Sequence, residues 1–238
     1  SEDGVVLGKY FFENRSRANY NEIPENLVNA FISTEDVRFR NHSGIDGRAL
    51  LRAIYGALTG KSSSGGASTI TQQLSKMLFT DKPSSGFDRV MQKLKEWIIS
   101  GQLEKRYTKD EILTMYLNRF DWVNNAVGIK SASKVYFNKS PIDLNVSESA
   151  MLVGMLKNPS YYNPNRRIEL TEGRRNIVLS QMNKYEVISD SLYDTLVQQP
   201  IVLNFKKASH NEGLAPYFRE YFRGELKKWC STHTKPNG

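Results

Sequence analysis

The chain repeats one local pattern many times: a polar capping residue followed by apolar residues spaced three and four apart. After Pro24, for example, Leu27, Val28 and Phe31 recur at the spacing of one helical face. Alternation of period two is confined to a few residues near the start and to 200–206. The sequence therefore predicts a mainly α fold, with helices over 24–35, 47–60, 69–78, 87–107, 108–118, 147–158, 171–185 and 188–200.

Several of these helices carry a signature in their first turn. Thr69 with Gln72, and Thr108 with Glu111, have the spacing of a capping box. Ser147 is the expected N-cap of the helix that follows it. Two helices also have an apolar stripe on one side, formed by Leu50, Leu51, Ile54, Tyr55 and Leu58 in 47–60 and by Val90, Leu94, Trp97 and Ile98 in 87–107.

Composition limits the size and the partners of the fold. With 238 residues, 39% of them hydrophobic, the chain is long enough for one large domain with a real core. Its formal net charge of +8 favours a partner that carries phosphate, such as nucleic acid, anionic lipid or a pyrophosphate substrate. Charge alone does not choose among these partners.

The metal-binding and disulfide-forming residues are few. Cys230 is the single cysteine, so an intramolecular disulfide and a cysteine zinc site are excluded. His42, His210 and His233 are far apart, and none is spaced as a metal-binding pair. No apolar run is long enough to span a membrane and the start lacks a signal-peptide layout, so the chain is expected to be soluble as written or cut free of an anchor.

Changes in periodicity divide the chain into three parts. We expect a lead-in over residues 1–22, one helical domain over 23–200, and an extension over 201–238 in which the periodicity is lost. A short helix around 215–226 is expected within the extension.

Adjacent carboxylates at Glu35 and Asp36 end the first expected helix. A carboxylate there lies at the negative end of the helix dipole beside a like charge, which leaves one group poised to take a proton. The alternative is a pair of exposed acids bound to Arg38 and Arg40. This segment alone does not exclude that alternative.

Three other segments contain residues that could take part in chemistry. Residues 60–62 match the end of a phosphate-binding loop, but the earlier glycine is missing and a helix precedes, so that interpretation is rejected. Lys93 and Glu96 are three residues apart, which is typical of a surface ion pair. Gln72, Gln73 and Lys76 have a spacing that lets them point together into a groove, near Ser68 and Thr69.

Taken together, these stretches resemble the peptidoglycan glycosyltransferases, the family that polymerises lipid II. "EDVRFRNHSG" is similar to the first family motif, at Glu35, Asp36, Phe39, His42 and Gly44. "GGASTITQQLSK" resembles the second motif, and "KDEILTMYLN" and "RRNIVL" the fourth and fifth. The resemblance covers residues 23 to about 200 in the expected order. The tail "EGLAPYFREYFRGELKKW" resembles the connector of a bifunctional penicillin-binding protein towards a transpeptidase domain that is absent here.

The chain departs from the family in its third motif. "QKLKE" keeps Lys93 and Glu96 but has Gln92 where the family usually has arginine. The basic residue that the family uses between the second and third motifs is either Lys82 or Arg89, and the sequence does not decide between them.

The resemblance implies roles for individual residues. Glu35 would be the general base that deprotonates the acceptor sugar, and Glu96 the second essential carboxylate. Lys76, Lys93 and Arg89 would stabilise the leaving pyrophosphate, while Asp36 would position Glu35. The substrate-binding residues implied are Asp36, Phe39, His42, Ser68, Thr69, Gln72, Gln73, Lys76, Arg89 and Lys93.

The resemblance also implies a lysozyme-like, two-lobed helical fold whose smaller lobe, around residues 78–92, meets the membrane surface. The partners would be lipid II and the growing glycan chain, at the extracytoplasmic (periplasmic) face of the bacterial membrane, with no nucleic acid. Some members use Mg²⁺ or Mn²⁺, although no ligand cluster here requires a metal. A lysozyme-like hydrolase or lytic transglycosylase, and a noncatalytic cationic module, are the alternative functions.

Overall fold

The computed structural model describes residues 17–59, 68–79, 83, 85–206 and 216–233. Within these ranges it is helical, and its extended pairing amounts to one isolated bridge between Asp121 and Val127. The mainly α prediction is confirmed. The α-helices are α1 (Glu25–Glu35), α2 (Gly47–Thr59), α3 (Ile70–Phe79), α4 (Gly86–Arg106), α5 (Lys109–Arg119), α6 (Ile129–Phe137), α7 (Val146–Met155), α8 (Ile168–Lys184), α9 (Asp190–Gln198) and α10 (Pro216–His233), with short 3-10 helices at Tyr20–Glu22, Phe39–Asn41 and Pro141–Asp143.

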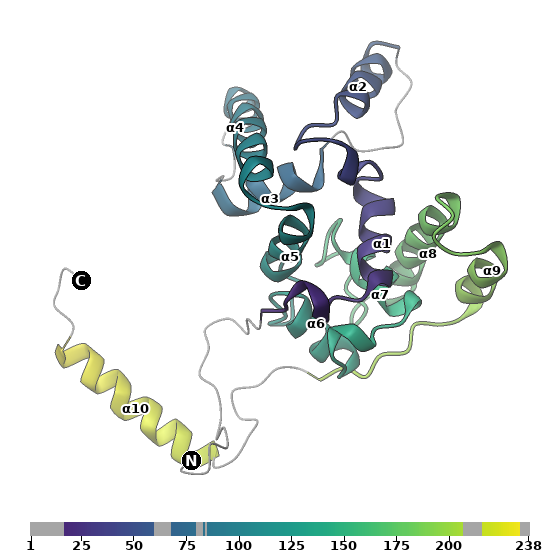
Figure 1. Cartoon of the computed structure of the whole chain (residues 1–238). Helices are drawn as coiled ribbons and strands as arrows, with labels where there is room; N and C mark the ends of the chain where they lie inside the picture. Colours follow the sequence, from purple (N-terminus) through teal and green to yellow (C-terminus); the bar gives the residue numbers. More distant parts are fainter. Residues whose placement is uncertain (1–16, 60–67, 80–82, 84, 207–215, 234–238) are drawn as a thin grey trace.

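The core forms around α7, which packs against α1 and α8 (Figure 1). Every residue of α7 from Ser149 to Met155 is buried, as expected for a helix surrounded by others. On α1 the buried face includes Leu27 and Phe31, and the Phe31 ring packs 4.7 Å from the Tyr116 ring of α5, centroid to centroid. This packing fixes the end of α1, where Glu35 lies.

The predicted helix cap is present in one helix and differs from the prediction in two. The capping box of Thr108 and Glu111 is present in α5. Ser147 was the wrong N-cap for α7, because Asn145 begins that helix and forms a capping box with Glu148. In α3 only half of the expected box forms: the Gln72 backbone N–H donates to the Thr69 hydroxyl, but the Gln72 side chain is directed elsewhere.

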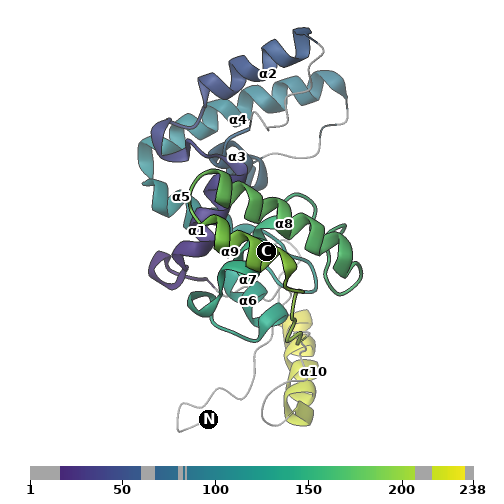
Figure 2. The same ribbon diagram turned by 90° about the vertical axis from the view of Figure 1, so that its right-hand side faces the viewer.

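One end of the molecule is formed by α2 and the first half of α4, which project away from α6 to α9 in both views (Figures 1 and 2). Among the described side chains of the predicted apolar stripes, Leu51, Tyr55, Val90, Leu94 and Ile98 do not enter the core. Exposed side chains there are Leu51, Tyr55, Leu78, Phe79, Phe87, Val90, Met91, Leu94 and Ile98, hereafter the α2–α4 apolar surface.

The packed body extends beyond residues 23–200. Ala18 is buried and exchanges two backbone hydrogen bonds with the Asn118 side chain. Residues 201–206 are extended and run past α6, where the N–H of Asn204 donates to the carbonyl of Tyr136. Despite the period-two alternation noted in the sequence, residues 201–206 form no strand. The helix expected around 215–226 is present as α10, which is longer and stands apart from the other helices (Figure 1).

Some sequence predictions fall outside the described residues. These are residues 60–62, Lys82, His210 and residues 1–16. In the part of the chain that the structure covers, no helix combines the length and apolar character needed to cross a membrane.

Candidate active site

Glu35 is the last residue of α1, and its carboxylate is half-buried beside α3. The side-chain amide of Gln73 donates to Oε2 of Glu35 over 2.9 Å. No described residue hydrogen-bonds to Oε1, which leaves that oxygen available to accept a proton. The expected placement of an acid at the helix end is confirmed.

Asp36 turns away from Glu35 into the protein. Its carboxylate oxygens lie 3.0 Å from Nε2 of His42, and Oδ2 also accepts the backbone N–H of Ile70. Nδ1 of His42 accepts the N–H of Gly44, so the ring proton lies on Nε2 and is donated to Asp36. The surface-acid alternative is therefore wrong, and Arg38 and Arg40 bind Asp46 and Asp110 instead.

Gly44 connects the loop after α1 to both α3 and α4. Its carbonyl accepts the Thr69 hydroxyl at 2.6 Å and the Gln72 amide at 3.2 Å. Its φ is +90°, and a Cβ at this position would lie 3.0 Å from the backbone of Ser100 in α4. Only glycine both adopts this positive φ readily and has no Cβ to clash with Ser100, which explains the glycine at the end of the first motif.

Glu96 is the second carboxylate of the site. Its side chain on α4 is almost completely buried, and Oε2 lies 2.6 Å from Nζ of Lys93. Lys93 also donates to the Ser68 hydroxyl at 3.0 Å. The predicted ion pair exists, but it is an interior carboxylate with a half-exposed cation rather than a surface pair.

A second ion pair, between Glu104 and Lys109, contacts the loop after α1. Glu104 of α4 accepts from the Thr71 hydroxyl and from Nζ of Lys109. The same ammonium donates to the carbonyl of His42 at 2.6 Å and lies 4.3 Å from the centroid of the Phe39 ring. This network joins α3, α4 and α5 to the segment that carries Asp36 and His42.

The predicted site residues separate into two groups. Glu35, Ser68, Gln73 and Lys93 are partly accessible, and Lys76 and Arg89 are exposed on the last turn of α3 and the first turn of α4. The inward group, which was expected to bind substrate, consists of buried side chains. It comprises Asp36, Phe39, His42, Thr69 and Gln72, and the prediction that Gln72 points into a groove with Gln73 and Lys76 is wrong.

Sequence reasoning missed Thr71, Glu104, Lys109 and Tyr116 as parts of this site. Lys109 and Tyr116 lie in the fourth motif, so their motif position was the available signal. Their contacts depend on how α5 packs against α3 and the loop after α1, which local spacing does not specify.

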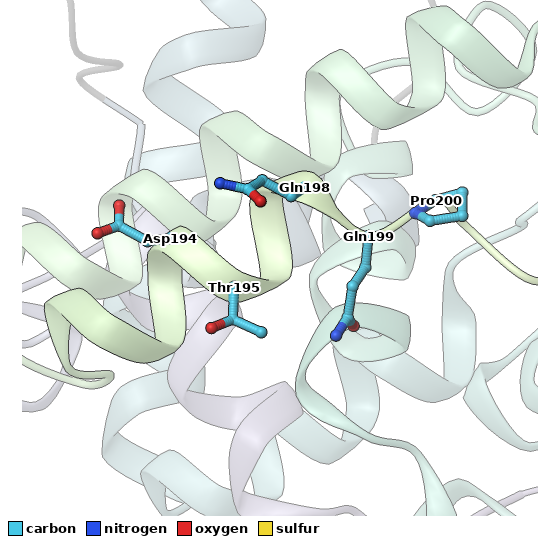
Figure 3. Close-up of a pocket in the computed structure, with 5 residues that line it drawn as sticks. All are labelled: Asp194, Thr195, Gln198, Gln199 and Pro200. Carbon is cyan, nitrogen blue, oxygen red and sulfur yellow. The ribbon is translucent and has the colours of Figure 1, made fainter.

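No group of three or more histidine, cysteine, aspartate or glutamate side chains in the described ranges could hold a metal ion. A shallow hollow of about 390 Å³ lies at the end of α9, lined by Asp194, Thr195, Gln198, Gln199 and Pro200 (Figure 3). It is separate from the candidate site, whose residues lie on α1, α3, α4, α5 and the loop after α1.

Comparison with known proteins gives the family. A transglycosylase family model matches residues 3–183. Penicillin-binding protein 1A of Haemophilus influenzae is 35% identical over 94% of this chain, and penicillin-binding protein 1F of Bacillus subtilis is 37% identical over 95% of it. The matched regions are 26% and 31% of those relatives, so this chain spans about a quarter to a third of their length.

The fold agrees with a solved structure. The crystal structure of Haemophilus influenzae penicillin-binding protein 1A superimposes with a TM-score of 0.51 at 23% identity, over 99% of this chain and 24% of that one. The family model covers most of the chain, in the same region as the motifs found in the sequence. The chain therefore belongs to the transglycosylase family.

Proposed function

We propose that this chain is a peptidoglycan glycosyltransferase that polymerises lipid II into glycan strands. The observation that carries the proposal is the arrangement of two carboxylates on either side of the start of α3. Glu35 is bound by Gln73 of that helix, and Glu96 is paired with the Lys93 ammonium that reaches Ser68 just before it. A general base and a bound cation thus flank one short segment.

Glu35 acts as the base. Its unbound Oε1 takes the proton of the 4-hydroxyl of the acceptor's GlcNAc, and the oxygen attacks C1 of the donor's MurNAc. The bond from C1 to the lipid pyrophosphate breaks with inversion, and undecaprenyl pyrophosphate leaves. A positioned base contributes about 10²- to 10⁴-fold to the rate, so other groups supply the remaining acceleration.

Cations stabilise the leaving group. By helical spacing Arg89, Lys93 and Glu96 share one face of α4, the face that continues to Ser100 and meets α3. Lys93 and Arg89 are placed to meet the negative charge that develops on the pyrophosphate, with Lys76 of α3 as a third cation. Glu96 does not face solvent; it holds the Lys93 ammonium in position.

The buried residues of the first two motifs hold the loop after α1 against α3, and thereby fix the position of the base relative to the acceptor. Asp36 ties His42 to the first residue of α3, while Thr69 and Gln72 tie α3 to Gly44. Small displacements of a reacting group cost large factors in rate, so these inward contacts serve catalysis without touching substrate.

The α2–α4 apolar surface is proposed to rest on the membrane that holds the lipid substrate. Phe87, Val90, Leu94 and Ile98 form an exposed stripe on α4 with the spacing of one helical face. Such a stripe suits the interface of a bilayer, and the positive net charge favours anionic lipid headgroups. We propose that the enzyme works there, at the extracytoplasmic face of the bacterial membrane.

The test is polymerisation of labelled lipid II by the wild-type chain and by Glu35→Gln. We expect the wild type to form glycan strands and the variant to lose at least about 100-fold in rate, because glutamine cannot take the proton. Circular dichroism and thermal unfolding check that the variant is folded.

Retained polymerisation by Glu35→Gln would contradict the proposal. Release of soluble fragments from preformed cell wall, without polymerisation, would favour the hydrolase or lytic transglycosylase. The same assay with and without a chelator tests whether a divalent ion is required.

A further inference from the structure

A hydrogen-bonded chain of three side chains leads from the interior to the candidate base. The hydroxyl of Tyr116 on α5 lies 2.9 Å from Oε1 of Gln73 on α3. Nε2 of the same Gln73 side chain lies 2.9 Å from Oε2 of Glu35 at the end of α1. Three helices thus meet through one amide group.

The direction of these hydrogen bonds follows from the chemistry of the groups. An ionised Glu35 only accepts, so the half of the Gln73 amide that faces it must be the NH₂ group. The carbonyl oxygen of Gln73 then faces Tyr116, and it also only accepts. The Tyr116 hydroxyl is therefore the donor, and it holds the amide in the orientation that the carboxylate requires.

Tyr116 is suited to this task because it keeps its proton and its position. Its side chain is 2% exposed, and burial, followed by the negative charge of Glu35, raises the pKa of Tyr116 well above its ordinary value. Its ring packs against Phe31 at 4.7 Å and stacks with Phe120 at 6.0 Å, centroid to centroid.

We infer that Tyr116 is a positioning residue for the glycosyltransferase reaction, acting on Glu35 only through the Gln73 amide. The inference rests on the proposed function. Without the hydroxyl, the Gln73 amide loses one of its two anchors and can rotate away from Glu35. With it, Oε2 of Glu35 is held and Oε1 is left to take the proton from the acceptor hydroxyl.

The experiment is a double-mutant cycle on lipid II polymerisation with wild type, Tyr116→Phe, Gln73→Met and the double variant. We expect Tyr116→Phe to lower kcat about 10-fold with KM nearly unchanged, because the base is displaced while substrate contacts remain. In the Gln73→Met background the same substitution should have almost no further effect on kcat, because the connection is already broken.

Tyr136→Phe is the matched control. Tyr136 is also buried, and its hydroxyl donates to the carbonyl of Trp122, away from α3. This variant should lose stability comparable to Tyr116→Phe and keep its kcat, which separates a lost buried hydrogen bond from a displaced base.

Independent, multiplying losses in kcat for the two substitutions would overturn the inference, as would an unchanged kcat in Tyr116→Phe. If Tyr116→Phe does not fold, an unchanged kcat in Gln73→Met still overturns it. Activity retained by Glu35→Gln would instead refute the proposed base, so the two failures are distinguishable.

Discussion

The ammonium of Lys93 lies 2.6 Å from the carboxylate of Glu96, whose side chain is only 4% exposed. A buried carboxylate is costly unless it is paired, so Glu96 and Lys93 stabilise each other's position. Because Lys93 itself is 43% exposed, the pair presents a fixed positive charge to solvent at the start of α3.

Glu96→Gln should therefore lower the polymerisation rate strongly and the free energy of unfolding only slightly. Glutamine keeps the size and one acceptor oxygen, but it no longer holds the Lys93 ammonium by charge. We expect lipid II polymerisation to fall at least about 100-fold and the free energy of unfolding to fall by about 1 kcal/mol or less, since the cation is half in solvent. Glu22→Gln, which breaks the distant pair with Lys130, is the control and should keep full activity. Equal losses in both variants would contradict the role of Glu96.

Gly44→Ala should destabilise the fold by about 3 kcal/mol, because it adds a methyl group at a positive φ and against the α4 backbone. Gly101 on the same helix α4 has open space around it, so Gly101→Ala should raise stability by about 0.5–1 kcal/mol. Denaturant unfolding of both variants measures the difference. A neutral Gly44→Ala would show that the loop can move away from Ser100.

The Arg38–Asp46 pair should make stability depend on pH. Burial raises the pKa of Asp46, but hydrogen bonds from Arg38 and from the backbone of Ala49 outweigh it and hold that pKa below its ordinary value. The stabilisation is therefore complete above about pH 4, the unfolded pKa of aspartate, and is lost as the pH falls through the lower folded value. Asp46→Asn should lower the Tm at pH 7, and this deficit should be smaller at pH 3, below the unfolded pKa of aspartate. A deficit that is the same at both pH values would contradict this assignment.

Lys109→Met should cost about 3 kcal/mol of stability, because it leaves the buried carboxylate of Glu104 without its cation. Adding Glu104→Gln should recover part of this loss, since the neutral amide can still accept from the Thr71 hydroxyl. Urea unfolding of both single variants and the double variant measures the coupling. Additive losses would show that the two side chains act independently.

Phe87→Gln, Val90→Gln and Leu94→Gln together should weaken binding to vesicles of anionic phospholipid by about 10- to 100-fold. Glutamine is a good helix former and these side chains are exposed, so the Tm should change little. Co-sedimentation with vesicles measures binding, and Val202→Gln, at an exposed position outside this surface, is the control. Unchanged vesicle binding by the triple variant would show that this surface does not meet the membrane.

Local sequence determined where the helices form. Helix α5 was predictable because its signals act within one or two turns: a capping box at Thr108 and Glu111, and an apolar stripe that includes Ile112, Leu113 and Leu117. In the structure this stripe is buried. The same applies to Glu35, since the end of the apolar run in α1 places it at the helix terminus. The motif order then identified the family.

Helical periodicity tells which residues share a face but not what that face meets. The stripes of α2 and α4 were predictable, but only the tertiary structure shows that Leu51, Tyr55 and Val90 are exposed. Likewise Gln72 and Gln73 are neighbours with the same chemistry, and packing alone sends one to the Gly44 carbonyl and the other to Glu35.

The sequence by itself determined the helices, their ends and the chemical types available at the site. Tertiary packing decided which polar groups became buried supports and which remained open to substrate. The physical reason is that capping and periodicity act over a few residues, whereas Glu35, Gly44 and Glu104 bind Gln73, Thr69 and Thr71, which are 38, 25 and 33 residues away in the chain.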